Sequence, residues 1–413
     1  MQMNNGWTRG QFLVFRVVFG LYLVYHFLSL LPWGAELFSS QGVLPQGAMS
    51  PLFRLFPNVF LLWDSPVFIQ ICLMAGAVFS LLLTIGKYNR VMAVLVWYLW
   101  ACLYGRNPLT GNPSLPFIGW LLLAYALIPS LSNRKEVSSS SEDSGPWKMP
   151  TDIFAAAWIL MALAYSYSGY CKLLSPSWMD GTALRHVLSN PLARDTVLRT
   201  SLLALPMWSL KAATWAALFL ELSFAPLALL RRLRPFLWLA MVGLHIGLLV
   251  LVNFSDLTIG MLLLHFFTFD PAWIPSAKPA GQPIFYDGHC GLCHGLVRFV
   301  LSEDQSARPF SFAPLQGEEI KRTIADPVRA KLPDSVVVVD ENRNVLTRSA
   351  AVIYVLKRLG GLWFLCATLF SFVPRALRDW AYDVIASVRK RIFGTTDDVC
   401  PLVPRPLRAR FLD

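Results

Sequence analysis

The sequence predicts a multi-pass α-helical membrane bundle of about eight spans, followed by a small α/β domain. Two observations support this fold class. Hydrophobic residues make up 55% of the 413 residues and charged residues only 15%, whereas soluble domains carry roughly 25% charged residues. The apolar residues also form long runs up to about residue 270, after which the composition becomes ordinary and short strand and helix patterns alternate.

The composition also excludes several classes of protein. Twenty-eight Phe, 15 Trp and a mean hydropathy of +0.50 exclude an ordinary soluble enzyme and a disordered chain. Seven cysteines are too few for a disulfide scaffold of this length. The net charge of +11 comes without a basic stripe that interleaves with aromatic residues. Cytoplasmic loops facing anionic lipid explain it more simply than nucleic-acid binding.

Eight apolar segments are candidate spans. The first begins at Gln11 with no cleavage site behind it, so we expect a retained helix rather than a signal peptide. The candidates are Gln11–Leu31, Val67–Ile85, Val91–Tyr104, Leu115–Leu131, Ile153–Tyr170, Ala212–Leu230, Phe236–Val252 and Leu257–Phe269. Leu52–Leu62 and Ser201–Leu210 resemble interfacial helices.

The distribution of Lys and Arg in the loops predicts a cytoplasmic N-terminus. On that side lie Arg9, Lys87, Arg90, Arg134, Lys135, Lys148, Arg231, Arg232 and Arg234; the opposite loops carry Arg54, Arg106, Lys172, Arg185, Arg194 and Arg199. An even number of spans then places the C-terminal domain in the cytoplasm. We expect a multi-pass protein of a bacterial inner membrane.

Two linkers divide the chain. Asn133–Pro150 contains four consecutive serines and is typical of a flexible loop. Pro271–Pro283 has four prolines in thirteen residues and ends the membrane part. The expected domains are therefore residues 1–272 and 283–413, joined by a linker at 273–282.

The C-terminal domain begins with strand and helix signals. We expect strands at Pro283–Tyr286, Ser335–Asp340 and Asn344–Thr347, and helices at Gly291–Leu301 and Ala350–Leu359. The apolar Gly361–Phe372 is too short to span a membrane. With a basic segment behind it, it is expected to lie on the membrane surface or on the domain.

The most specific motif is Y-D-G-H-C-G-L-C-H, Tyr286–His294, which places a Cys-x-x-Cys pair between a strand and a helix. A thiolate at a helix N-terminus is stabilised by the helix dipole and free N–H groups, so Cys290 is the expected nucleophile and the more exposed thiol. Cys293, one helical turn away, would resolve the mixed disulfide. His289 could stabilise the thiolate or pass a proton.

Other interpretations of this motif remain open. One Cys-x-x-Cys is half of a zinc site, which His289, His294 and Cys400 could complete. No second Cys-x-x-Cys follows, so we expect no metal, and a plain structural pair is the remaining alternative. Cys72, Cys102 and Cys366 lie in apolar runs and are expected to be packing residues.

Four further blocks carry a resemblance to a known family. Together with the cysteine motif, F-A-P-L-Q-G (Phe312–Gly317), P-D-S-V-V-V-V-D (Pro333–Asp340), T-R-S-A-A-V (Thr347–Val352) and the tail R-A-R-F-L-D (Arg408–Asp413) resemble the thiol-disulfide oxidoreductases named for their Asp-Cys-Cys motif. The resemblance covers roughly residues 283–413 and implies Asp287, Cys290 and Cys293 as motif residues. It also implies a thioredoxin-like fold with a cis Leu332–Pro333 bond, and Pro333 beside the cysteines.

Ionisable residues inside the apolar segments are costly and need partners. Arg16 and His26 lie in the first segment, Glu221 in the sixth, and His245 and His265 in the seventh and eighth. We expect Arg16 and Glu221 to form a buried pair, or to share a polar cavity with His245. Either arrangement could simply hold the bundle together.

Lys172 ends the fifth apolar segment and precedes a loop with Trp178 and Gly181. A buried lysine there could act as a base, whereas an exposed one would be a snorkelling side chain. This segment, with Arg16, Glu221-Leu222-Ser223 and Gly243–His245, resembles the membrane domain of vitamin K-dependent gamma-carboxylase over roughly residues 8–270. The resemblance implies Lys172 as the base. Where the carboxylase has asparagine–histidine, this chain has Asn112-Pro113, and glutamate carboxylation is not expected.

The sequence thus favours a membrane-bound thiol-disulfide oxidoreductase that reduces or exchanges disulfides through Cys290 and Cys293. Thiol exchange requires no cofactor, and the partners would be a disulfide-containing protein or small thiol and the lipid bilayer. The alternatives are a carboxylase-like enzyme that modifies a quinone or lipid, with a vitamin K-like quinone in the membrane domain, and a non-enzymatic membrane scaffold.

Overall fold

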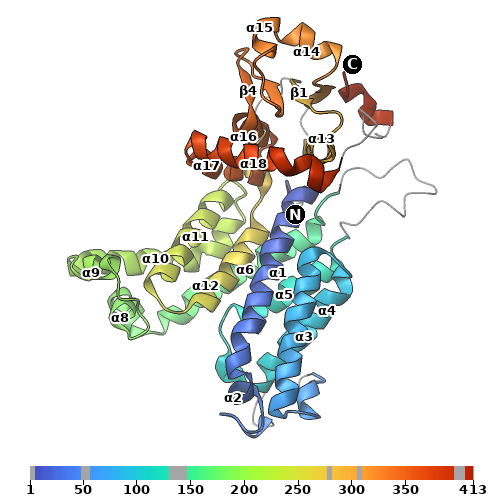
Figure 1. Cartoon of the computed structure of the whole chain (residues 1–413). Coiled ribbons are helices and arrows are strands. Elements are labelled where there is room, and N and C mark those ends of the chain that lie inside the picture. The colour runs from blue at the N-terminus through green and yellow to red at the C-terminus, as the bar shows by residue number, and fades with distance from the viewer. Residues whose placement is uncertain are drawn as a thin grey trace. The chain divides into compact units, whose positions relative to one another are not determined.

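A computed structural model of the chain describes residues 5–47, 56–129, 147–276, 281–304, 309–394 and 405–412. The chain divides into two compact units (Figure 1). The first, the helical unit, contains described residues 13–47, 56–129 and 149–269, and the second, the α/β unit, contains the remainder. Residues 5–12 therefore belong to the α/β unit, although they precede the helical unit in sequence.

All eight expected apolar segments are helices. They are α1 (Arg9–Leu30), α3 (Pro66–Ile85), α4 (Asn89–Arg106), α5 (Leu115–Leu127), α6 (Thr151–Leu173), α10 (Met207–Ala228), α11 (Arg234–Leu251) and α12 (Ser255–Thr268). Local signals set their ends. The Ser65 hydroxyl accepts the Phe68 N–H at the start of α3, and Gly86 ends it in the left-handed conformation with φ 86°.

Among the residues that the structure describes, five helical segments are long and apolar enough to cross a membrane. They are Arg9–Phe38, Pro66–Ile85, Thr151–Leu173, Met207–Ala228 and Arg234–Leu251. Leu115–Leu127, Ser255–Thr268 and Gly361–Ser371 are apolar but shorter. The length and composition of these helices indicate a membrane protein, while the count of eight spans and the orientation stay predictions.

Short helices connect the long ones. They are α2 (Gly34–Phe38), α7 (Pro176–Met179), α8 (Ala183–Ser189) and α9 (Val197–Leu203). Of the two expected interfacial helices, Leu52–Leu62 lies partly outside the described residues and forms a 3-10 turn at Val59–Leu61. Ser201–Leu210 is not one helix, because Pro206 separates the end of α9 from the start of α10. Most of Asn133–Pro150 lies outside the described residues.

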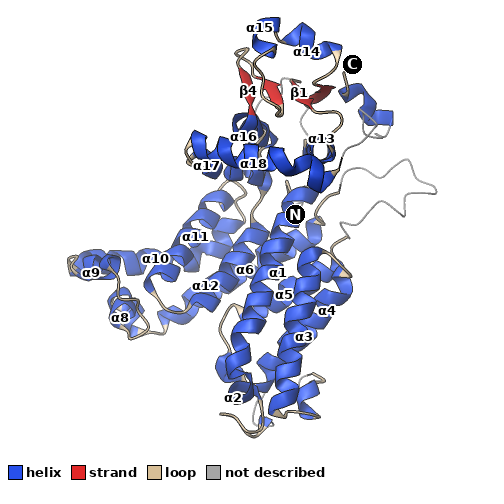
Figure 2. Cartoon of the chain, in the orientation of Figure 1, coloured by secondary structure: helices blue, strands red, loops and turns tan. Residues whose placement is uncertain are grey.

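The α/β unit contains a four-stranded sheet (Figure 2). Its strands are β1 (Pro283–Tyr286), β2 (Ser311–Pro314), β3 (Val337–Val339) and β4 (Val345–Thr347), in the order β2-β1-β3-β4. β1 and β2 are parallel, and β3 is antiparallel to β1 and β4. Its helices are α13 (Gly291–Glu303), α14 (Glu318–Thr323), α15 (Asp326–Arg329), α16 (Arg348–Leu359), α17 (Gly361–Ser371) and α18 (Arg375–Phe393). The sequence did not predict β2, whose four residues include Pro314 and show no clear alternation.

Both faces of this sheet are buried. Side chains alternate along a strand, so Ile284 and Tyr286 face the core built by α13 and α16, while Phe285 faces the core that includes Ile320 of α14. Burial on both sides explains the continuous valine run of β3. The C-terminal tail also packs here, because the Leu412 N–H donates to the Phe312 carbonyl at 2.8 Å.

Candidate active site

The two cysteines lie where β1 ends and α13 begins. Cys290 is the N-cap residue of α13, and Cys293 lies in its first turn. The Cys290 N–H donates to the Asp287 carbonyl at 3.2 Å, and the His294 N–H donates to the Cys290 carbonyl at 3.1 Å. Both cysteines are free thiols, and their side chains are hydrogen-bonded to each other.

The end of α18 covers the start of α13. The Gly291 N–H donates to the Gly394 carbonyl at 3.2 Å, and a Cβ atom at Gly291 would lie 2.3 Å from the Phe393 carbonyl oxygen. Cys290 is therefore 0% exposed and Cys293 5%. The expectation that Cys290 is the more exposed thiol is wrong, because the chain that covers it comes from a helix about 100 residues further along.

The two thiols have different surroundings. Burial raises the pKa of the Cys293 thiol to about 12, and the neighbouring Cys290 adds to the rise. Cys293 also lines an apolar cavity of about 320 Å³ between α13 and α18, with Leu296, Tyr382 and Arg389 among its walls. Cys293 is thus a protonated thiol at neutral pH that faces a cavity large enough for a small ligand.

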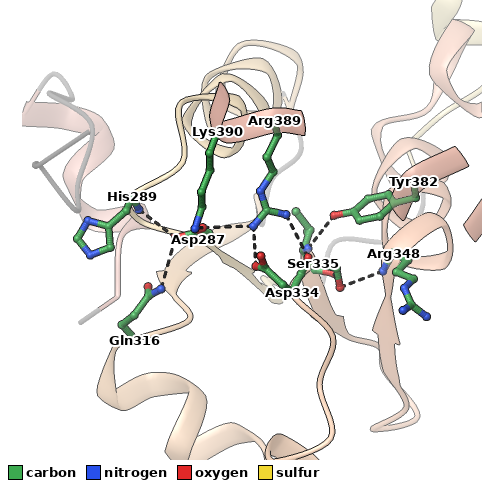
Figure 3. Close-up of polar contacts among 10 residues, drawn as sticks. Asp287, His289, Gln316, Asp334, Ser335, Arg348, Tyr382, Arg389 and Lys390 are labelled. Carbon is green, nitrogen blue, oxygen red and sulfur yellow. Dashed lines mark hydrogen bonds and ion pairs between the residues drawn. The ribbon is translucent and has the colours of Figure 1, made fainter. Parts of the chain in front are cut away.

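Asp287 organises the polar side of the site (Figure 3). Its carboxylate accepts from the His289 N–H at 3.1 Å and from Gln316 at 3.4 Å, and it lies 3.2 Å from both Arg389 and Lys390. Burial works to raise the pKa of Asp287, but these donors and charges outweigh it and hold the pKa below its usual value. The charged carboxylate therefore fixes the turn that carries Cys290.

Arg389 is the buried cation of the site. Its side chain is 3% exposed and donates to the Asp334 carboxylate at 2.6 Å and to the Asp334 carbonyl at 3.1 Å. Burial works to lower the pKa of Arg389, but Asp334 and the charges that the two thiols would carry raise it above its usual value. A buried guanidinium near both sulfurs can stabilise a thiolate when one forms.

The sequence blocks that suggested the family converge on this site. Gln316 comes from F-A-P-L-Q-G and Asp334 from P-D-S-V-V-V-V-D. Ser335 accepts the Arg348 N–H at 3.3 Å, and the Val336 N–H donates to the Tyr382 hydroxyl at 3.0 Å. The sequence did not identify Arg389, Lys390 or Tyr382, whose only signal was a basic, amphipathic C-terminal helix.

The two histidines of the motif have different surroundings. His289 is exposed, and its ring points away from Arg389 (Figure 3). His294 is buried, and its Nε2 donates to the Gly288 carbonyl at 2.8 Å, which steadies the turn. Cys400 lies outside the described residues. In the part of the chain that the structure describes, no three His, Cys, Asp or Glu side chains form a group that could hold a metal ion.

The expectation of a cis Leu332–Pro333 bond is wrong, since every peptide bond among the described residues is trans. The Ser335 N–H donates to the Pro333 carbonyl at 2.8 Å, and this tight turn leads into β3 without a cis bond. The trans isomer is also intrinsically favoured by about 0.5–1 kcal/mol. Asp334, the next residue, is the one that contacts Arg389.

In the helical unit, Lys172 pairs with Glu221 rather than Arg16 with Glu221. The Lys172 ammonium also donates to Ser168 at 3.2 Å and lies 4.8 Å from the ring centroid of Trp178. The expected Arg16–Glu221 pair is wrong, because Gly169 lets α6 approach α10 so closely that Lys172 reaches Glu221. Arg16 instead bonds to the Tyr125 side chain.

Two further polar clusters lie in the helical unit. The Tyr165 hydroxyl is 2.7 Å from Nε2 of both His245 and His265, so the three buried side chains form one hydrogen-bonded chain. Asp256 binds Tyr22 at 3.0 Å, His26 at 3.2 Å and Asn112 at 2.8 Å beside a cavity of about 300 Å³.

Comparison with known proteins shows which family the α/β unit resembles. Residues 284–395 match the DCC1-like thiol-disulfide oxidoreductases. The chain is 34% identical over 141 residues to the uncharacterized protein YuxK of Bacillus subtilis, across 33% of this chain and 98% of that protein. It is 34% identical over 117 residues to the chloroplastic DCC family protein At1g52590 of Arabidopsis thaliana, across 28% of this chain and 67% of that protein. No solved structure matches the chain significantly.

Through its C-terminal part, the chain belongs to the DCC1-like thiol-disulfide oxidoreductase family. The family supports a thiol-disulfide redox role. The expected resemblance of the membrane part to vitamin K-dependent gamma-carboxylase stays a prediction.

Proposed function

We propose that the protein is a membrane-bound thiol-disulfide oxidoreductase in which Cys290 and Cys293 exchange disulfides. The observation that carries the proposal is the position of both free thiols at the start of α13, with Arg389 and the Asp287 network beside them. The strand order β2-β1-β3-β4 with β3 antiparallel supports a thioredoxin-like fold. The five membrane-length helices support anchoring in a bilayer.

The proposed reaction transfers two electrons. The Cys290 thiolate attacks one sulfur of a substrate disulfide, so that a mixed disulfide forms and the other substrate sulfur leaves as a thiolate. Cys293 then loses its proton and attacks Cys290, which releases the second substrate thiol and leaves a Cys290–Cys293 disulfide. A donor dithiol reverses these steps on the enzyme. Because the pKa of Cys293 is about 12, it would stay protonated until the mixed disulfide forms.

The experiment follows reduction of a fluorescent disulfide-linked peptide pair by the full chain in nanodiscs. We expect Cys290→Ser to abolish reduction and Cys293→Ser to accumulate a mixed disulfide through Cys290. Cys366→Ser, a free cysteine of α17, is the matched control and keeps full activity. Undiminished activity of Cys290→Ser would refute the assignment of Cys290 as the nucleophile. A mixed disulfide trapped on Cys293 would show that the two thiols have the opposite roles.

A second candidate is a membrane enzyme that modifies a quinone or lipid, with Lys172 as base. It is favoured by the position of Lys172, whose ammonium is held between Glu221, Ser168 and the Trp178 ring rather than in bulk water. A proton could pass between Lys172 and Glu221 in this pair. Quinone-dependent turnover that is lost in Lys172→Met but kept in Lys87→Met, an exposed lysine, would support it. Equal turnover in both variants would leave the helical unit as an anchor.

A further inference from the structure

The α/β unit carries a large exposed apolar face on its last two helices. On α18, five apolar side chains at helical spacing are 39–65% exposed: Leu377, Trp380, Val384, Val388 and Ile392. At the end of α17 and just beyond, Leu369, Phe370 and Phe372 are 59–81% exposed. Exposed apolar side chains that form one continuous helical stripe indicate a binding face, whereas isolated ones do not.

The opposite side of α18 is already occupied by the redox site. Tyr382 bonds to β3, Arg389 lies between Asp287 and Asp334, and Ala386 lines the cavity beside Cys293. The outward stripe is therefore not needed for the core of the unit. One side of α18 packs on the redox site, and the other side exposes its apolar residues.

The charges around the stripe match an anionic surface. Arg391 is exposed and lies next to Ile392 of the stripe, whereas Arg378 lines a cavity on the side of Tyr382 and Ile385. The acidic residues of α18 are neutralised within the unit, since Asp379 binds Ser349 and Arg375, and Asp383 binds Arg348. An apolar helical face with basic residues and inwardly paired acids is typical of helices that lie in the headgroup region of a bilayer.

The start of α17 is bonded to the start of a membrane-length helix. The Leu362 N–H donates to Gln11 Oε1 at 3.0 Å, and Trp363 Nε1 donates to Glu303 at 2.7 Å. The same Glu303 accepts the Gly10 N–H at 2.8 Å. Gly10 and Gln11 belong to the first turns of α1, which begins the membrane-length segment Arg9–Phe38. The start of α17 is therefore bonded to residues of the α/β unit that directly precede the helical unit in the chain.

An apolar cavity of about 310 Å³ lies next to the stripe. Its walls come from α16, α18 and the end of α17, and they include Leu356, Phe370, Val373, Leu377 and Ile385. A cavity with apolar walls of this kind can take the end of a hydrocarbon chain.

From these observations we infer that α17 and α18 dock the α/β unit on the surface of a bilayer that contains anionic lipid. The docking face consists of Leu369, Phe370 and Phe372 with Leu377, Trp380, Val384, Val388 and Ile392. Arg391 contacts the lipid phosphates. Docking would hold Cys290 and Cys293, on the other side of α18, at a fixed depth above the bilayer.

The test places a benzophenone amino acid at Trp380 of the full chain in nanodiscs of phosphatidylcholine and phosphatidylglycerol. The control probe replaces Arg322 of α14, an exposed side chain on the far side of the sheet (Figure 1). After illumination, lipid adducts are measured by intact mass. We expect about tenfold more lipid adduct from position 380 than from position 322, because only the first would lie among headgroups and acyl chains. Leaving out phosphatidylglycerol should reduce the adduct at position 380 several-fold.

A second probe at Ile392, which is 65% exposed, guards against local misfolding at position 380. Equal lipid adducts at positions 322, 380 and 392 would overturn the proposal, as would adducts formed with protein, which would show that a second copy or the chain itself covers the face. Membrane insertion is checked separately by co-elution with the nanodisc. If the chain does not co-elute with the nanodisc, both the proposed membrane anchoring and the proposed docking of the α/β unit are refuted. A failure of the disulfide assay would leave the docking result intact.

Discussion

Arg389 and Lys390 offer a matched pair of substitutions in one ion cluster. Each cation lies 3.2 Å from the same carboxylate oxygen of Asp287, but the Arg389 side chain is 3% exposed and that of Lys390 is 52% exposed. Removing one partner of a buried ion pair costs roughly 3–5 kcal/mol. Because Asp287 would keep Lys390 and the His289 N–H, we expect Arg389→Met to cost about 3 kcal/mol, the lower end of that range.

Lys390→Met is the control, and its loss of stability is compared with that of Arg389→Met. Lys390→Met removes an equally close but solvent-screened charge and should cost about 0–1 kcal/mol. A loss of about 3 kcal/mol corresponds to a factor of about 10² in the unfolding equilibrium constant. With a dependence of about 1–3 kcal/mol per M urea, the midpoint for unfolding of the α/β unit should fall by about 1–3 M.

The assay is pulse proteolysis of the full chain in detergent micelles across a urea series, following the C-terminal fragment. The reasoning fails if Arg389→Met leaves the midpoint unchanged, or if both variants lose the same stability. The double variant Asp287→Asn/Arg389→Met should lose less stability than the sum of the two single changes, since it leaves no buried carboxylate without its partner.

Three other predictions follow from the same unit. Folding lowers the pKa of Asp287, so the contribution of this carboxylate to stability is complete above the ordinary pKa of about 3.9 and is lost as the pH falls through the folded value. The urea midpoint for unfolding of the wild type should therefore fall when the pH is lowered below about 4, and the midpoint of Asp287→Asn should fall less. Gly291→Ala should push the end of α18 away and raise several-fold the rate at which a bimane reagent labels Cys290. Gly295→Ala, which has open space around its Cβ, should leave the rate unchanged. Equal rates in the two variants would show that α18 does not shield Cys290 from solvent. Glu303→Ala should speed hydrogen exchange of the Gly10 amide and Glu303→Gln less so, because the carboxylate accepts that N–H at 2.8 Å, and unchanged exchange would contradict the bond.

Local patterns predicted the elements that carry the site. The apolar runs were long enough to identify every main helix of the helical unit, because a helix of about 20 apolar residues needs no distant partner to be recognised. The turn Asp287–Cys290 was equally clear, since β1, the Cys-x-x-Cys spacing and the start of α13 lie within a dozen residues. The role of the pair as the redox centre stays a proposal.

Contacts between distant residues decided what these patterns left open. The sequence by itself determined that Cys290 caps a helix, but the accessibility of Cys290 depends on Phe393 and Gly394, which only packing brings there. The sequence also showed that Glu221 needs a partner, yet Arg16 and Lys172 fit that need equally well by charge. The close approach of α6 and α10 at Gly169 chose Lys172, because the energy of a buried charge depends on which opposite charge can reach it, and that distance is a property of the tertiary structure.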